Sequence, residues 1–201
     1  VSYLKREQYG YRPLLHGQYF TASLVDQEEG DPIYMKGKEK YEIVDFDLKN
    51  TYDPEKTTIL PRVYSTQESH KRSYRAKLGL QEGQDPTFGD NLYFMFTHQL
   101  GHMYWRYFLW NFSGRESDFS DASWMGFTHA LTIDYPDYIK ENKGHNNYLM
   151  LPLILGLVGF FFQAKKDPKY FYVNLMLFLM MGVVLVLYLN SPPIEPRERD
   201  Y

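Results

Sequence analysis

The chain has 201 residues, enough for one or two domains, and its formal net charge of −3 offers no bulk basic surface for nucleic acid. It contains no cysteine, which excludes disulfides, thiol catalysis and cysteine-based metal sites together. Aromatic residues are abundant, with 19 Tyr, 14 Phe and 3 Trp, and this composition is typical of a membrane–water interface or of an aromatic binding cleft.

The first half of the chain is polar and is expected to fold as an α+β region with short strands. Residues 1–9 are expected to form one short helix, and residues 26–37 and 49–56 carry the Gly, Pro and acidic clusters of loops. Strand character is found at 33–35, 41–44 and 57–60, and the Lys-Gly-Lys at 36–38 can join the first two strands into a hairpin. Residues 64–80 show no clear pattern, so no structure is assigned to them.

Residues 91–112 are strongly aromatic and long enough to cross a membrane. His98, His102 and Arg106 are spaced four apart, so a helix would place all three on one face. Because an intramembrane Arg is costly, we favour a flat or re-entrant interfacial helix over a membrane span. The two His have the spacing of metal ligands, but the Glu of the zinc-protease motif is missing between them, so a polar helix face is favoured over a metal site.

Two charge-free apolar runs follow, at 148–162 and 170–189. The second has the length of a membrane span, whereas the first is short and spans only with an extra helical turn or a thinner bilayer. The seven residues between them hold Lys165, Lys166 and Lys169, and short Lys-rich loops stay on the cytoplasmic side. The runs are therefore predicted to form a two-helix transmembrane hairpin whose outer ends lie on the opposite face.

Arg197 and Arg199 follow the second run after a Pro-rich turn, at the expected depth of lipid headgroups. A guanidinium binds phosphate through paired donors, so these two residues are candidates for holding a lipid phosphate. The neighbouring Glu195, Glu198 and Asp200 give an equally good alternative, a surface ion-pair cluster.

The expected architecture is a mostly α membrane protein fragment, since the chain has no leader pattern and stops just past an apolar run. It comprises an extracytoplasmic α+β region at 1–90, an aromatic interfacial helix and loop at 91–147, the transmembrane hairpin at 148–190 and an extracytoplasmic Pro/Arg-rich segment at 191–201.

Seven segments, taken together and in order, resemble a known family; they are residues 6–10, 13–22, 60–65, 86–92, 101–108, 110–115 and 196–201. The family consists of multi-pass membrane proteins of Bacteroidota that were long labelled a domain of unknown function. It is related to the animal endoplasmic-reticulum protein O-mannosyltransferase of glycosyltransferase family 117. The chain departs from the family after Gly114-Arg115, where a longer Gly/Asn-rich stretch is usual.

The resemblance implies a GT-C glycosyltransferase that moves a sugar from a polyprenyl-phosphate donor to an acceptor, with a protein hydroxyl as one candidate. It implies a bacterial inner-membrane location with 1–147 and 191–201 periplasmic, and partners in the lipid bilayer, the lipid-linked sugar and an acceptor protein. The catalytic carboxylate of such enzymes lies in a loop outside this chain, so no catalytic residue, metal or cofactor is assigned. The substrate-binding candidates are Arg197, Arg199, Arg106, Arg115, Tyr104 and Trp105.

Two alternative functions are also compatible with the sequence. The first alternative is a non-enzymatic, membrane-anchored binding or assembly module whose aromatic face docks a partner protein. The second is a transporter fragment in which Arg106 and the histidines line a polar path.

Overall fold

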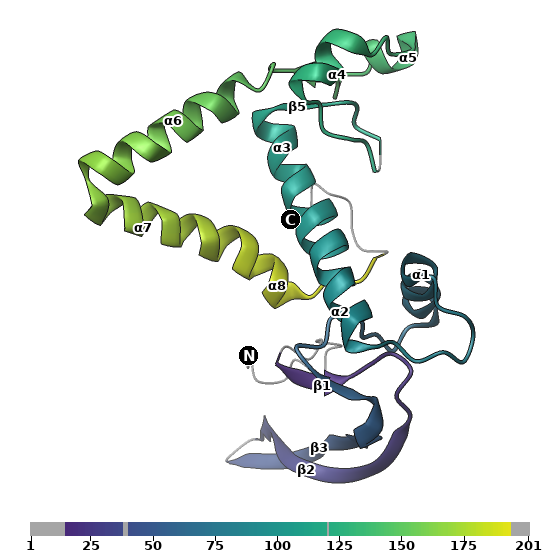
Figure 1. The fold of residues 1–201 in the computed structure, drawn as a ribbon. Coiled ribbons are helices and arrows are strands. Elements are labelled where there is room, and N and C mark those ends of the chain that lie inside the picture. The colour runs from purple at the N-terminus through teal and green to yellow at the C-terminus, as the bar shows by residue number, and fades with distance from the viewer. Residues whose placement is uncertain (1–14, 38–39, 120, 194–201) are drawn as a thin grey trace. The chain divides into compact units, whose positions relative to one another are not determined.

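A computed structural model describes residues 15–37, 40–119 and 121–193, and it has a mixed α/β fold with short strands (Figure 1). The chain divides into two compact units. Of the described residues, the first unit holds those up to 94 together with 192 and 193, and the second holds those from 95 to 191.

The first unit contains a small sheet, a long ribbon and two helices. Its elements are β1 (His16–Gln18), β2 (Leu24–Lys36), β3 (Tyr41–Tyr52), the 3₁₀ turn η2 (Pro54–Lys56), β4 (Thr57–Ile59), α1 (Glu68–Leu78) and α2 (Phe88–Phe94). Strands β1 and β4 pair antiparallel, as do β2 and β3. Gly79 in the left-handed conformation ends α1, as is common at helix C-termini.

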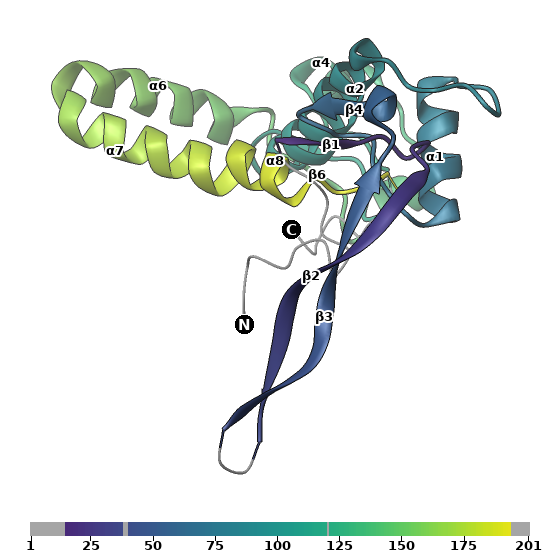
Figure 2. The ribbon, with the colours of Figure 1, turned by 90° about the horizontal axis from the view of Figure 1, so that it is seen from below.

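The ribbon of β2 and β3 is the most extended part of this unit (Figure 2). Its ladder shifts register between Leu24 and Asp26, between Glu29 and Pro32, and between Ile33 and Tyr34. Each shift places one extra residue in one of the two strands. The extra residue returns the apolar side chains that follow it to the face held by the earlier ones. In consequence, apolar pairs gather on one face; they are Leu24–Tyr52, Pro32–Phe46, Tyr34–Ile43 and the residue Leu48.

A compact aromatic core holds the rest of this unit together. The ring of Tyr74 stacks on Phe20 at 5.8 Å and meets the edge of Phe94 at 5.1 Å, and Val63 is fully buried beside them. Asn91 on α2 is also fully buried. Its Oδ1 accepts hydrogen bonds from the backbone N–H of Arg62 (2.6 Å) and Val63 (3.2 Å), and its amide donates to the carbonyl of Leu60 (2.8 Å). One side chain thus fixes the buried 60–63 segment to α2.

The second unit is built on one aromatic helix, a polar loop region and a helical hairpin. Its elements are the π-helical η3 (Met95–Trp105), α3 (Arg106–Phe112), β5 (Gly114–Arg115), α4 (Phe127–Thr132), α5 (Asp137–Lys140), β6 (Asn146–Asn147), α6 (Leu151–Lys166), α7 (Pro168–Leu179), the π-helical η4 (Met180–Val184) and α8 (Leu185–Leu189).

The hairpin turns at a single residue. Asp167 ends α6 and begins α7, where its side chain accepts a hydrogen bond from the N–H of Tyr170 and Pro168 occupies the first helical turn. Phe160 and Phe171 meet edge to face at 4.7 Å near this turn, and the helices diverge beyond it (Figure 1). None of the residues of α6, α7, η4 or α8 is buried.

One helix among the described residues is long and apolar enough to cross a membrane, Pro168–Leu189 with 22 residues and a mean hydropathy of 2.3. Helix α6 has 16 residues, which makes it about 24 Å long, and a hydrocarbon core is about 30 Å thick. Among the described residues the structure therefore supports one candidate span, and it does not show the two-helix membrane hairpin predicted from the sequence.

The structure corrects two predictions in the first unit and confirms two others. Residues 26–36 and 49–52 are strand rather than loop, because the Gly, Pro and acidic residues that suggested loops fall at the register shifts or in exposed positions of the ribbon. Residues 68–78, left without assignment, form α1. The hairpin of 33–35 with 41–44 and the strand at 57–59 are confirmed. The helix expected at 1–9 lies outside the described residues.

Candidate functional site

The second unit carries two features that could bind a ligand, a polar cluster and an apolar groove, and both involve the helical residues 95–112. The cluster is defined as His98, His102, Arg106, Trp110, Arg115 and Asp121, and the groove as the cavity between η3–α3 and α7–α8 described further below.

The predicted stripe of ionisable residues is found on one face of the helix. The rings of His98 and His102 stack at 5.4 Å, and Nη2 of Arg106 lies 3.1 Å from Nε2 of His102. His102 Nε2 is also 2.9 Å from a carboxylate oxygen of Asp121. Trp110 continues the same spacing, one turn beyond Arg106, and its buried ring lies 4.5 Å from the Arg106 guanidinium carbon.

Arg106 mainly links the helix to the loop that follows it. It is buried, its Nε donates to the carbonyl of His102 (3.1 Å) and its Nη1 donates to the carbonyl of Ala122 (2.8 Å). Because these donors are already engaged with backbone oxygens, the structure favours a positioning role for Arg106 over direct contact with a ligand.

Arg115 is the more accessible cation of the cluster. Its guanidinium lies 5.4 Å from the Trp110 ring, a cation–π distance, and its Nε donates to the carbonyl of Gly144 (3.1 Å). No further hydrogen bond of this guanidinium is found within the described part of the chain, and the residue is half-buried. A Cβ at Gly144 would lie 2.6 Å from the backbone nitrogen of Asp118 and 2.7 Å from Nη2 of Arg115, so the Asp118 backbone leaves no room for a side chain at this position.

A short polar network holds the loop that carries Arg115. Strands β5 and β6 pair Arg115 with Asn146, and Asn142 Oδ1 accepts from the N–H groups of Asp118 and Gly144. His145 Nδ1 lies 2.7 Å from the carbonyl of Glu116. Nearby, burial raises the pKa of the Tyr135 phenol, and the negative charge of Glu116 raises it further.

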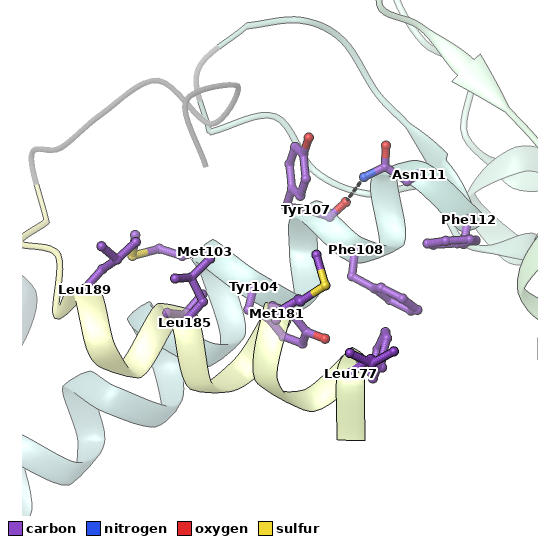
Figure 3. Close-up of a pocket in the computed structure, with 13 residues that line it drawn as sticks. Met103, Tyr104, Tyr107, Phe108, Asn111, Phe112, Leu177, Met181, Leu185 and Leu189 are labelled. Carbon is purple, nitrogen blue, oxygen red and sulfur yellow. Dashed lines mark hydrogen bonds between the residues drawn. The ribbon is translucent and has the colours of Figure 1, made fainter. Parts of the chain in front are cut away.

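The groove is a cavity of about 630 Å³ between the aromatic helix and the candidate span (Figure 3). Its walls are almost entirely apolar; they are formed by Met103, Tyr104, Tyr107, Phe108, Asn111 and Phe112 on one side and Leu177, Phe178, Met181, Gly182, Leu185, Val186 and Leu189 on the other. The volume lies within the range of small-molecule sites, roughly 300–1,000 Å³.

A buried polar lock, formed by Gln99, Asn190 and Ser191, joins η3 to the end of α8. Gln99 is fully buried, and its Nε2 donates to Oδ1 of Asn190 (2.8 Å) and to the carbonyl of Ser191 (3.3 Å). Asn190 itself adopts the left-handed conformation that ends α8. This pair of side chains fixes the C-terminal end of the candidate span to η3.

The six residues predicted to bind substrate are only partly brought together. Arg106 and Arg115 converge on Trp110, while Tyr104 lines the groove and contacts Phe178 at 6.4 Å. Trp105 meets Tyr104 edge to face at 5.2 Å and remains 47% exposed. Arg197 and Arg199 lie outside the described residues.

Sequence reasoning missed Trp110, Asp121 and Gly144 in the cluster, and Gln99 and Asn190 in the lock. Trp110 could have been found, because it extends the spacing of four that links His98, His102 and Arg106. The contacts of Asp121 and Gly144 and the Gln99–Asn190 contact join residues from 19 to 91 positions apart, for which the sequence carries no local pattern. Among the described residues, no group of three or more His, Asp or Glu is arranged to hold a metal ion.

Comparison with known proteins places a family match on the first part of the chain. Residues 10–96 match a family of unknown function (DUF8416), which agrees with the expectation of a domain of unknown function. The match gives no link to glycosyltransferase family 117 or to the Bacteroidota proteins that the motifs resemble. No curated protein and no solved structure matches the chain.

Proposed function

We propose that the chain is part of an integral-membrane glycosyltransferase that moves a sugar from a polyprenyl-phosphate donor to an acceptor, with α6–α8 as a hairpin in the bilayer. The observation that carries the membrane half of this proposal is the candidate span, which has 22 residues, a mean hydropathy of 2.3 and no buried residue. The transfer half is supported by the ordered motifs in the sequence and by the chemistry available around Arg115.

The Lys-rich turn at 165–169 supports an orientation for the hairpin. Lys165 and Lys166 end α6 and Lys169 lies in the first turn of α7, so three cations gather at the tip. Such loops are retained in the cytoplasm, and residues 113–147 would then face the periplasm of a bacterial inner membrane. Because α6 is short, its crossing requires local thinning of the bilayer or a contribution from the residues before it.

Arg115 is the described residue best suited to contact the donor. A guanidinium offers two parallel donors to a phosphate. The Arg115 guanidinium lies against the buried ring of Trp110, and its Nε donates a hydrogen bond to the carbonyl of Gly144. In this proposal Arg115 binds the donor phosphate, and Arg106 positions the loop through Ala122. The acceptor is a hydroxyl-bearing molecule, and the catalytic carboxylate comes from outside this chain.

The test is transfer of radiolabelled sugar from a polyprenyl phosphate to protein, in membranes that contain the full-length protein. The Arg115→Ala change should lower transfer by about tenfold or more, since charge-assisted hydrogen bonds contribute roughly 1.5–3 kcal/mol. The matched control is Lys143→Ala, which removes an exposed cation from the same loop region and should leave transfer unchanged. Equal transfer by both variants would remove Arg115 from the proposal, and absence of transfer with any donor would refute the enzyme.

A second function, a membrane-anchored assembly module, is favoured by the ribbon of β2 and β3. A two-stranded ribbon is marginally stable alone, yet Tyr34, Ile43 and Leu48 on its apolar face are each more than half exposed. Large exposed apolar patches mark interaction sites. If transfer is absent and a partner protein protects this face from labelling, the assembly module replaces the enzyme.

A further inference from the structure

We infer that the ribbon of β2 and β3 packs face to face against the same ribbon of a second copy of this chain, with a two-fold axis between them. The inference goes beyond the proposed function, because this contact requires neither sugar transfer nor a membrane hairpin. It is based on how the side chains are distributed over the two faces of the ribbon, which extends away from the rest of its unit (Figure 2).

The register of the ribbon separates an apolar face from a charged face. Directly opposed residues share a face, faces alternate along each strand, and the extra residue of a bulge is skipped. The charged face carries Asp26, Glu28, Glu42, Asp45 and Lys49 and is therefore suited to water. In the distal half of the ribbon, the apolar face consists of four rows, Glu29–Leu48, Pro32–Phe46, Tyr34–Ile43 and Lys36–Tyr41.

Nothing among the described residues covers this apolar face. Tyr34, Tyr41, Ile43 and Leu48 are each more than half exposed, and a two-stranded ribbon is marginally stable until further strands or a packed layer cover it. Pairing along an edge is hindered by the bulges in both strands and by Pro32, which has no N–H to donate. Packing of one apolar face on another, about 10 Å apart, is therefore the favoured way to cover it.

Two charges on the apolar face identify a second copy as the occupant. Glu29 lies in the first of the four rows and Lys36 in the last, and both belong to β2. A two-fold axis perpendicular to the strands, between the Pro32–Phe46 and Tyr34–Ile43 rows, places β2 over β2 in the reverse direction. Glu29 of each copy then faces Lys36 of the other, and the apolar rows between them face each other. The surface is thus complementary to itself in charge and polarity, as an isologous interface requires.

The size of the apolar face determines how the contact should be measured. Four rows on two strands are about 25 Å long and about 10 Å wide, by the usual spacings within and between strands. This area is smaller than the roughly 800 Å² that each partner buries in a standard interface, so the dimer is expected to dissociate readily on dilution. Covalent capture in the membrane is therefore the suitable readout.

The first experiment is cysteine cross-linking of the full chain in membranes, because the sequence has no native cysteine. Ile43→Cys places a thiol next to the proposed axis, so a short bismaleimide should give a product of twice the chain mass. The matched control is Glu42→Cys, the neighbouring residue on the opposite face, which should give about tenfold less of this product. Equal yields from the two variants, or an adduct with a different protein, would overturn the inference.

Charge reversal in the Ile43→Cys background tests the two-fold pairing itself. Glu29→Lys alone and Lys36→Glu alone each turn two attractive pairs into two repulsive ones, so each should lower the yield about tenfold. Co-expression of the two variants should restore the yield, because every contact between unlike copies again joins opposite charges. This recovery also shows that both variants fold. Glu28→Lys, on the charged face, is the matched control and should cross-link like the parent.

The remaining outcomes separate this inference from other occupants and from the proposed function. An unchanged yield in the single charge variants, or no recovery on co-expression, would refute the two-fold pairing. Labelling of the apolar face by a diazirine phospholipid, without a cross-linked dimer, would assign the face to the bilayer. Capture of the dimer upholds the inference whether or not sugar transfer is found, and transfer without a dimer refutes the inference alone.

Discussion

The lock between Gln99 and the end of α8 gives the most direct test of how the candidate span is held. The Gln99→Leu change keeps the volume of the side chain but removes its hydrogen bonds to Asn190 and Ser191. Each buried hydrogen bond has a net worth of about 1 kcal/mol, so loss of the two bonds costs about 2 kcal/mol. Removal of Gln99 Oε1, a buried oxygen with no hydrogen-bond partner among the described residues, offsets part of this cost, and the expected fall in the free energy of unfolding is about 1–2 kcal/mol.

The assay is tryptophan fluorescence during denaturation of the full chain in detergent, because Trp105, Trp110 and Trp124 all belong to the second unit. The control is Gln163→Leu, the same chemical change at an exposed hydrogen bond to Asn174, and it should cost under about 1 kcal/mol. If the two variants unfold alike, the lock contributes nothing and the reasoning fails.

Two further predictions concern residues away from the groove. Asn91→Ala should speed hydrogen exchange at the amides of Arg62 and Val63, because both lose their buried acceptor, and unchanged exchange at these amides would contradict the role given to Asn91. Lys140→Met should raise the pKa of Asp134 toward its usual range, because the hydrogen bond from Lys140 (2.6 Å) holds that pKa low. The linked stability is present above the ordinary carboxylate pKa and is lost as pH falls through the lowered value, so carboxyl NMR titration of both proteins checks the shift and its direction.

The features that follow from local periodicity were predictable from the sequence. The spacing of four between His98, His102 and Arg106 predicted a shared helix face, and the structure stacks the two rings there. The long apolar run before Asn190 predicted the candidate span. The π-helical turns that begin at Met180 within this span were not predicted.

The ribbon shows why composition wrongly predicted loops in this region. Gly30, Asp31 and Pro32 are typical turn residues, and here they supply an irregular register that keeps apolar side chains on one face. The bulge depends on the partner strand, 14 or more positions away, so no window of local sequence contains the information. Helix α1 was missed for another reason: its sequence is mostly polar, and only His70 and Tyr74 are buried.

The site needed tertiary structure for the same reason. Arg106 and Arg115 were both candidates, but their roles separate only when Ala122 is seen to accept from one and Gly144 from the other. Gly182 is one small residue in an apolar run, and its importance follows from the Tyr104 ring that lies against it.

The central claim is that α6–α8 forms a membrane hairpin, and the absence of native cysteine allows a direct measurement. Single variants Lys166→Cys, at the tip, and Lys140→Cys, before α6, are probed with a membrane-impermeant maleimide in right-side-out and inverted vesicles. The account predicts that Lys166→Cys reacts only from the cytoplasmic side and Lys140→Cys only from the other. Reaction of both from one side would contradict the hairpin.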